Sequence, residues 1–332
     1  MSRITRAWRA WVALTSEREP ALVLALFRIA IATVAVGSLL SAATSGVVDV
    51  LWIARPHGAL RLTGDWLVEA LGGATPTVIW GLFAVALSSC ALVAVGLGGR
   101  LPCLVAAQTY LALARVNDDA AGGYDAMINN ALYLLMFSGA WETLSLDCRR
   151  RTGRWTSATD VPAWPRYLLV FQLLVIYGST ALHKLSPVWT PFGGYSALWW
   201  VFQDPTWRRF DMSFVAGLYP LLQVATAITW HWELAMPLLL VWYGCARTRD
   251  RGGRLRALVV RWDLRKPFAA VGVVLHLGIL LTLNVGPFSL ASLAYYLLLW
   301  TPEEVGAALA RLRDGAGLLS RGRDAAFPNP GG

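Results

Sequence analysis

The segment RYLLVFQLLVIYGSTALHKL, residues 166–185, decides the fold class of this chain because it is an almost uninterrupted apolar run. A helix needs about 20 apolar residues to cross a bilayer. Hydrophobic residues make up 56% of the 332-residue chain and charged residues 15%, whereas soluble domains are about 25% charged. The sequence therefore predicts an all-α protein, a polytopic integral membrane helical bundle.

About eight transmembrane helices are expected from runs of this kind. The third, fourth and eighth are short, and the sixth is long enough to be a tilted or broken helix, or a surface helix that leads into a span. The expected spans are 21–42, 77–97, 101–116, 126–142, 166–184, 213–244, 267–285 and 287–300.

The distribution of basic residues gives the orientation. With eight spans, 22 of the 29 lysines and arginines fall on the side that holds both termini, and six fall on the other, among them Arg61. Basic residues mark cytoplasmic loops, so both termini are expected in the cytoplasm and Lys184 at the outer end of its span. The net charge of +9 then reflects topology, and we expect no nucleic-acid partner. The arginines in 247–265 also suit anionic lipid head groups.

The chain shows no internal repeat and no separate soluble domain. Residues 1–19 read as a basic amphipathic helix on the cytoplasmic surface, 20–304 as the transmembrane domain and 305–332 as a cytoplasmic tail. The outer segments 43–76 and 185–212 are rich in tryptophan, proline and glycine, which favours amphipathic pieces broken by turns. The expected location is the inner membrane of a bacterial cell, with the lipid bilayer as a partner.

Lys184 is one of only two lysines beside 27 arginines. Arginine would serve as a cation at the membrane edge, but lysine alone can lose its proton when desolvated. One reading is that Lys184 extends to the lipid head groups; the other is that it acts as a base. Tyr177 and Thr180, seven and four residues earlier, would place hydroxyls on the same helical face.

Other ionisable residues within the spans each need a reason, because charge is costly in a bilayer. Arg28 could extend to the surface or pair with a carboxylate. Glu233 could pair with an arginine or histidine, or act in catalysis, and His276 could be a hydrogen-bonded core residue or a base. His183 and His231 are the remaining candidates.

The outer segment 185–212 concentrates aromatic residues after Gly193-Gly194. It could form a quinone-sized cleft, or simply an aromatic belt at the interface. The sequence holds no GxSxG, HExxH, P-loop or dinucleotide-binding motif, so hydrolases, metalloproteases and ATP-driven transporters lack their characteristic parts. We expect no metal site.

Five segments, in order, carry a family likeness: INNALYLLMFSGAWETLSLD (128–147), FQLLVIYGSTALHKL (171–185), VWTPFGGYSALWW (188–200), TWHWELAMPLLL (229–240) and LHLGILLTLNVGPFSLASLAYYLLLWTPEE (275–304). Through them the chain resembles the HTTM (horizontally transferred transmembrane) family, which includes the vitamin K-dependent gamma-glutamyl carboxylases. The likeness covers most of 20–304.

The resemblance implies that Lys184 deprotonates a reduced quinone, either vitamin K or menaquinol. Oxygen then adds, and the quinone rearranges to a strongly basic alkoxide on the way to its epoxide. In a carboxylase this alkoxide removes a proton from a peptide glutamate, which captures CO₂; this is lyase chemistry. The residues implied are Lys184, His183 and Tyr177 as catalytic, Asn129 and Asn130 lining the site, Trp189, Gly194, Tyr195 and Trp199 shaping the cleft, and His231, Glu233 and His276 in an inner polar layer.

Two departures bear on this activity. The family's asparagine segment continues with a histidine that assists the lysine, but Ala131 stands there. The large luminal part that grips a protein substrate is also absent from this sequence. The alternative is a non-catalytic membrane protein that matures or exports a secreted peptide, similar to the sporulation-delaying protein B group, or that binds a lipid or quinone. A secondary transporter would show internal symmetry, and none is visible.

Overall fold

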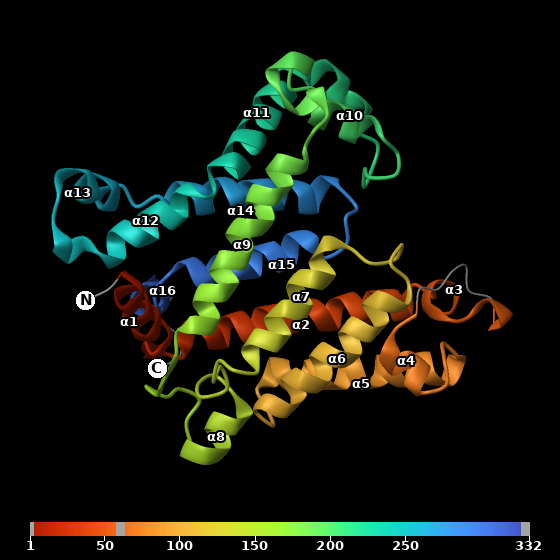
Figure 1. The fold of residues 1–332 in the computed structure, drawn as a ribbon, viewed down its shortest axis with the longest axis horizontal. Coiled ribbons are helices and arrows are strands. Elements are labelled where there is room, and N and C mark those ends of the chain that lie inside the picture. The colour runs from red at the N-terminus through yellow and green to blue at the C-terminus, as the bar shows by residue number, and fades with distance from the viewer. Residues whose placement is uncertain (1–2, 58–63, 327–332) are drawn as a thin grey trace.

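The structure, a computed structural model, describes residues 3–57 and 64–326 (Figure 1). The chain is 74% helical, which confirms the predicted all-α class. Arg61 lies outside the described residues. The α-helices are α1 (Arg3–Thr15), α2 (Leu22–Thr44), α3 (Val48–Trp52), α4 (Trp66–Ala70), α5 (Pro76–Val95), α6 (Arg100–Val116), α7 (Gly123–Leu135), α8 (Leu146–Thr152), α9 (Trp164–His183), α10 (Ala197–Gln203), α11 (Tyr219–Ala235), α12 (Leu238–Arg247), α13 (Arg254–Arg261), α14 (Arg265–Thr282), α15 (Phe288–Tyr296) and α16 (Pro302–Ala326).

Within the described residues, five helical stretches are long and apolar enough to cross a membrane, and two shorter apolar helices accompany them. The chain is thus a multi-pass membrane protein, while the count of eight spans stays a prediction. The five stretches are Leu22–Thr44, Pro76–Val95, Trp164–His183, Ser213–Ala235 and Arg254–Thr282, and the shorter ones are Leu238–Arg247 and Phe288–Leu299.

Helix α2 lies at the centre of the core, because its own apolar side chains point to nearly every side of the helix. It packs against α5, α7 and α15. Phe27 of α2 meets Tyr295 of α15 edge to face, with ring centroids 5.1 Å apart. The Tyr295 hydroxyl donates a hydrogen bond of 2.9 Å to the Met127 carbonyl in α7. One continuous core therefore joins both ends of the sequence.

Figure 1 shows α1 and α16 at the left end of the bundle, with α3 and α4 at the right. The first and last helices thus share one end of the bundle. Helix α9, drawn in green, runs from the lower left of the view toward α10 and α11 at the top.

A small antiparallel sheet precedes α9. Strand β1 (Arg18–Pro20) pairs with β2 (Asp160–Pro162), and Glu19 lies opposite Val161. Two nitrogens of Arg166 donate to the Glu19 carboxylate, at 2.7 and 2.6 Å. The sheet and this buried ion pair fix the chain immediately before α9 and at its first turn.

Both interpretations of Arg28 from the sequence were wrong. Arg28, in α2, does not reach the surface and does not form an ion pair with a described carboxylate. It is 1% exposed, and its guanidinium donates to four backbone carbonyls: those of Val93, Ala94 (2.6 Å), Ala140 (3.2 Å) and Leu144 (2.7 Å). Carbonyls in the last turn of a helix lack donors within the helix, so Arg28 satisfies the end of α5. Its role is structural.

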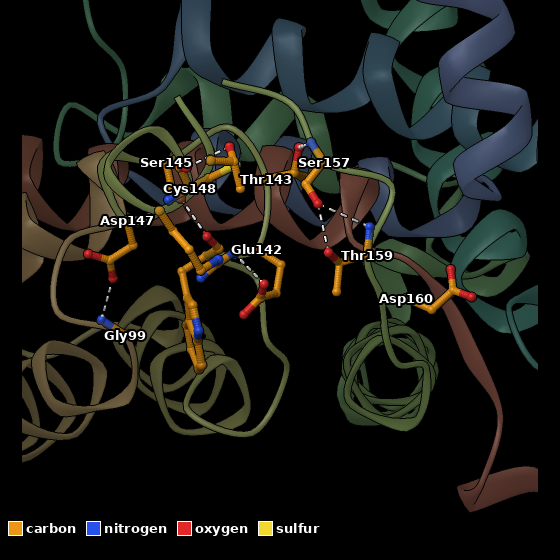
Figure 2. Close-up of polar contacts among 12 residues, drawn as sticks. Gly99, Glu142, Thr143, Ser145, Asp147, Cys148, Ser157, Thr159 and Asp160 are labelled. Atoms are coloured by element: carbon orange, nitrogen blue, oxygen red, sulfur yellow. Dashed lines mark hydrogen bonds and ion pairs between the residues drawn. The ribbon is translucent and has the colours of Figure 1, made fainter. Parts of the chain in front are cut away.

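The turn at residues 145–147, where the first family-like segment ends, has a structural role (Figure 2). The Ser145 hydroxyl accepts a hydrogen bond of 2.9 Å from the Cys148 amide and so caps α8. The Asp147 carboxylate accepts from the amides of Gly98 and Gly99, at 2.9 and 3.0 Å. These bonds hold α8 against the turn between α5 and α6.

The long predicted span 213–244 is broken, which is one of the alternatives that the sequence left open. A 3₁₀ turn, η4 (Ser213–Leu218), leads into α11, which ends before Met236-Pro237 and is followed by α12. Proline lacks the N–H that continues a helix. An apolar groove of about 320 Å³ lies beside this break; its lining residues are Leu174, Val175, Gly178, Ser179, Leu182, Leu234, Pro237 and Leu240.

Candidate active site at the end of α9

Lys184 follows α9 directly, where the backbone leaves the helix with ψ of 66°. Its ammonium forms an ion pair with the carboxylate of Glu233, on the packed neighbour α11. The Lys184 side chain is 14% exposed and the Glu233 side chain 6%. The ammonium is therefore held inside the protein and does not extend to the surface. The expectation that Glu233 pairs with an arginine or histidine was wrong, because its partner is Lys184.

Trp189 covers the ammonium, whose Nζ lies 4.2 Å from the centroid of the tryptophan ring. Two 3₁₀ turns, η2 (Pro187–Trp189) and η3 (Pro191–Gly193), fold the chain back after α9 and bring this ring into place. The face of an aromatic ring attracts a cation, and more strongly when both are desolvated. The amine thus lies between one carboxylate and one aromatic face.

A second polar group, the tyrosine–histidine cluster, consists of Tyr177, His276 and Tyr296. The Tyr177 hydroxyl is hydrogen-bonded to Nε2 of His276 and, at 2.9 Å, to the Tyr296 hydroxyl. Trp232, the residue before Glu233, packs edge to face with Tyr177, with ring centroids 4.8 Å apart. Helices α9, α11, α14 and α15 therefore meet at one buried polar point.

The cluster lies beside the ion pair, because Tyr177 contacts Trp232 and Trp232 precedes Glu233 in the chain. His276 is 1% exposed, and its Nδ1 has no hydrogen-bond partner among the described residues. His276 is thus the hydrogen-bonded core residue that one reading expected, and it keeps one ring nitrogen for a further polar partner.

Close packing at Gly272 of α14 gives a test of this cluster. A Cβ atom there would collide with the Tyr296 hydroxyl and would lie 2.9 Å from the Trp232 ring. We expect Gly272→Ala to lower the free energy of unfolding by about 1–3 kcal/mol, the usual cost of overpacking. Gly278→Ala is the control on the same helix, because a Cβ there meets nothing within 4 Å. Thermal unfolding of both variants in one detergent measures the difference; equal midpoints would contradict the packing.

The hydroxyl line predicted along α9 does not form. The Thr180 hydroxyl is exposed and donates to the Ile176 carbonyl at 2.7 Å, while the Tyr177 hydroxyl joins the cluster. The helical spacing fails because Lys184 lies beyond the last helical residue. Its side chain accordingly turns to α11 instead of following the face of α9.

The predicted cleft residues in 185–212 pack onto α11. The Gly194 carbonyl accepts a hydrogen bond of 2.6 Å from the Gln223 side chain, and Gly194 and Tyr195 both have positive φ, 65° and 52°. The Tyr195 ring lies 5.9 Å from that of His231. Trp199 packs against Tyr219, with centroids 5.9 Å apart. This aromatic segment covers the part of α11 that precedes Glu233.

Four other predicted residues do not join the ion pair. His183 and His231 are exposed, and each ring Nδ1 is hydrogen-bonded to the carbonyl four residues earlier. Asn130 is exposed as well. Asn129 is 6% exposed within α7, and its Oδ1 has no partner among the described residues.

Tyr296 and Trp232 belong to the site but were not singled out from the sequence. Tyr296 had a signal, because a tyrosine hydroxyl inside an apolar span needs a hydrogen-bond partner. For Trp232 the only signal in the sequence was its position beside Glu233. Its indole N–H donates to the Phe268 carbonyl at 3.1 Å, which joins α11 to α14.

The ion pair can serve as a proton-transfer unit. A proton that moves from the Lys184 ammonium to the Glu233 carboxylate leaves a neutral amine beside a neutral acid, without changing the net charge of the site. Apolar surroundings favour such a neutral form over separated charges. The neutral amine can then accept a proton from a substrate hydroxyl. In the described residues, no group of three or more His, Cys, Asp or Glu side chains could hold a metal ion.

In a comparison with known families, the model of the HTTM domain matches residues 17–249. No curated protein and no solved structure matches the chain. The matched range includes Lys184, Trp189 and Glu233, whereas His276 and Tyr296 lie beyond it.

Proposed function

Because this chain belongs to the HTTM domain family, we propose that it is a membrane enzyme in which Lys184 acts as a base on a quinol. The observation that carries the proposal is the burial of Lys184 beside Glu233 and beneath Trp189. A chain that uses arginine for nearly all its cations places a lysine at the position where loss of a proton is useful.

Each of the three residues has a distinct task in this proposal. Glu233 takes the proton of the Lys184 ammonium, and the neutral amine takes the proton of a bound hydroxyl. The resulting ammonium then stabilises the oxyanion that forms beside it. Trp189 shields the amine from water, which strengthens both interactions.

The residues around the pair fit a quinol better than a strongly polar substrate. Trp189 offers an aromatic face, and the 320 Å³ groove between α9 and the α11–α12 break offers an apolar channel for an isoprenoid tail. Nδ1 of His276, in the neighbouring tyrosine–histidine cluster, is a buried polar atom without a partner among the described residues. A reduced vitamin K or menaquinol supplies the hydroxyl and the electrons for reaction with O₂; CO₂ is a further substrate if a glutamate is carboxylated.

The test is an assay of the purified protein with menaquinol or vitamin K hydroquinone, measuring epoxide formation and oxygen uptake. We expect Lys184→Ala to abolish both. Lys266→Ala should be silent, because the Lys266 side chain is 72% exposed and lies far along the chain from the pair. Equal rates for the two variants would contradict the proposal.

Ala131 favours a second candidate, in which the protein handles a secreted peptide without quinol chemistry. Ala131 is fully buried in α7. Because this residue is an alanine, the imidazole that the family places here is missing. Lys184 would then remain a permanent structural cation of Glu233. Under this candidate the purified protein shows no quinol turnover, and its removal from cells blocks the appearance of a mature peptide.

A further inference from the structure

The chain that follows α9 crosses itself where η3 passes η2. A Cβ atom on Gly193 would lie 2.4 Å from both the carbonyl carbon and the carbonyl oxygen of Pro187, and 2.6 Å from the amide nitrogen of Val188. These three atoms belong to the backbone, so they cannot rotate away as the end of a flexible side chain can. Gly193 does not have the positive φ of Gly194. Glycine is therefore needed at 193 because of space and not because of backbone conformation.

Hydrogen bonds fix both sides of this crossing, and we call the segment 186–196 that contains it the clasp. The Pro187 carbonyl accepts from the amide and from the hydroxyl of Thr190, at 2.8 and 2.9 Å. The Thr190 carbonyl in turn accepts from the amides of Gly193 and Tyr195, at 3.2 and 3.1 Å. A shift of either side at the crossing would therefore break hydrogen bonds on the other.

The clasp is also bonded to α11, the helix that carries the carboxylate partner of Lys184. The Gln223 side chain of α11 donates to the Gly194 carbonyl at 2.6 Å, and η2 packs against the same helix. Trp189 is the last residue of η2 and follows Pro187 closely in the chain. The crossing at Pro187 therefore sets where the Trp189 ring lies relative to the Lys184 ammonium, whose Nζ is 4.2 Å from the ring centroid.

We propose that Gly193 is a positioning residue, whose missing side chain lets η3 lie against η2 and so holds Trp189 over Lys184. Gly193 acts through the ring and not on the substrate. The inference rests on the proposed function and deepens it, because a shielded amine is the base in that function. A displaced ring would admit water to the amine, and water weakens the electrostatic interactions that the base needs.

The reactivity of the Lys184 amine reports the position of the ring without any quinol. The folded protein is treated with a small amine-specific reagent, and mass spectrometry of peptides gives the labelling rate of Lys184 relative to Lys266, whose side chain is 72% exposed. We expect Gly193→Ala to raise this ratio by roughly tenfold, because overpacking displaces the clasp. Gly217→Ala should leave the ratio unchanged, because Gly217 lies in η4 and a Cβ there meets nothing within 4 Å.

A double variant separates positioning from a general loosening of the fold. Trp189→Ala should itself raise the Lys184 labelling ratio, and the addition of Gly193→Ala should raise it no further, because the ring through which Gly193 acts is already gone. Fold-changes that multiply in the double variant would overturn the proposal. A ratio in Gly193→Ala equal to that of wild type would do the same.

Thr190→Val is a milder second variant, which decides the matter if Gly193→Ala does not fold. It removes the hydroxyl that donates to the Pro187 carbonyl, so it should raise the Lys184 labelling ratio by roughly threefold, the effect of one hydrogen bond. Epoxide formation by the same samples keeps the inference apart from the proposed function. The expected labelling ratios without any quinol turnover would contradict the proposed function alone. Turnover by wild type with unchanged ratios in Gly193→Ala and Thr190→Val would contradict only the positioning role of Gly193.

Discussion

Lys184→Arg is expected to lower quinol turnover by about 10²- to 10⁴-fold, the range that a positioned base contributes. Arginine retains the positive charge, so it can still pair with Glu233 and lie over Trp189. It cannot lose its proton in a protein. The substitution therefore keeps the cation and removes only the base.

The assay compares steady-state epoxide formation by wild type, Lys184→Arg and Lys184→Ala. Thermal unfolding of the same samples serves as the folding control, and Lys184→Arg should retain most of the stability of wild type. A loss of turnover of only about tenfold would be smaller than the loss expected when a base is removed. It would mean that the site needs only a cation, and it would contradict the role of Lys184 as a base.

Glu233→Leu is expected to have the largest effect on stability, lowering the free energy of unfolding by about 3–5 kcal/mol. The Lys184 ammonium would remain without its counter-charge on a side chain that is only 14% exposed. Replacement of both partners with apolar residues removes the uncompensated charge, so Lys184→Met combined with Glu233→Leu should recover most of the loss.

Unfolding of the two single variants and the double variant in one detergent completes a double-mutant cycle. A double variant that is much more stable than the sum of the single effects supports a coupled pair. Strict additivity of the two losses would show that the residues do not interact, and the site described around them would be wrong.

The helices of this protein could be predicted well from the sequence, because hydrophobic runs set their length and position. The break near Pro237 was among the expected alternatives, since proline interrupts the hydrogen-bond ladder. Arg28 was harder to interpret: its partners are carbonyls at the end of α5 and in the loop after α7, more than 60 positions away in sequence. Because every residue has a backbone carbonyl, no residue type in the sequence marks these partners.

The candidate site could be predicted only in part for the same reason. Lys184 was conspicuous as a lysine among arginines, but its partner Glu233 is 49 residues away, and periodicity reports only neighbours within one helix. The error about the hydroxyls of Tyr177 and Thr180 could have been avoided. Pro187 disfavours helix in the residue before it, and α9 ends shortly before that point. The tyrosine–histidine cluster joins three helices and needed the tertiary structure.

Reaction of the folded protein with an amine-specific reagent, followed by mass spectrometry of peptides, tests the central claim most directly, because the chain has only two lysines. Lys266, whose side chain is 72% exposed, should be modified rapidly, while Lys184 stays protected until the protein is denatured. Modification of Lys184 at the rate of Lys266 in the folded protein would contradict the account.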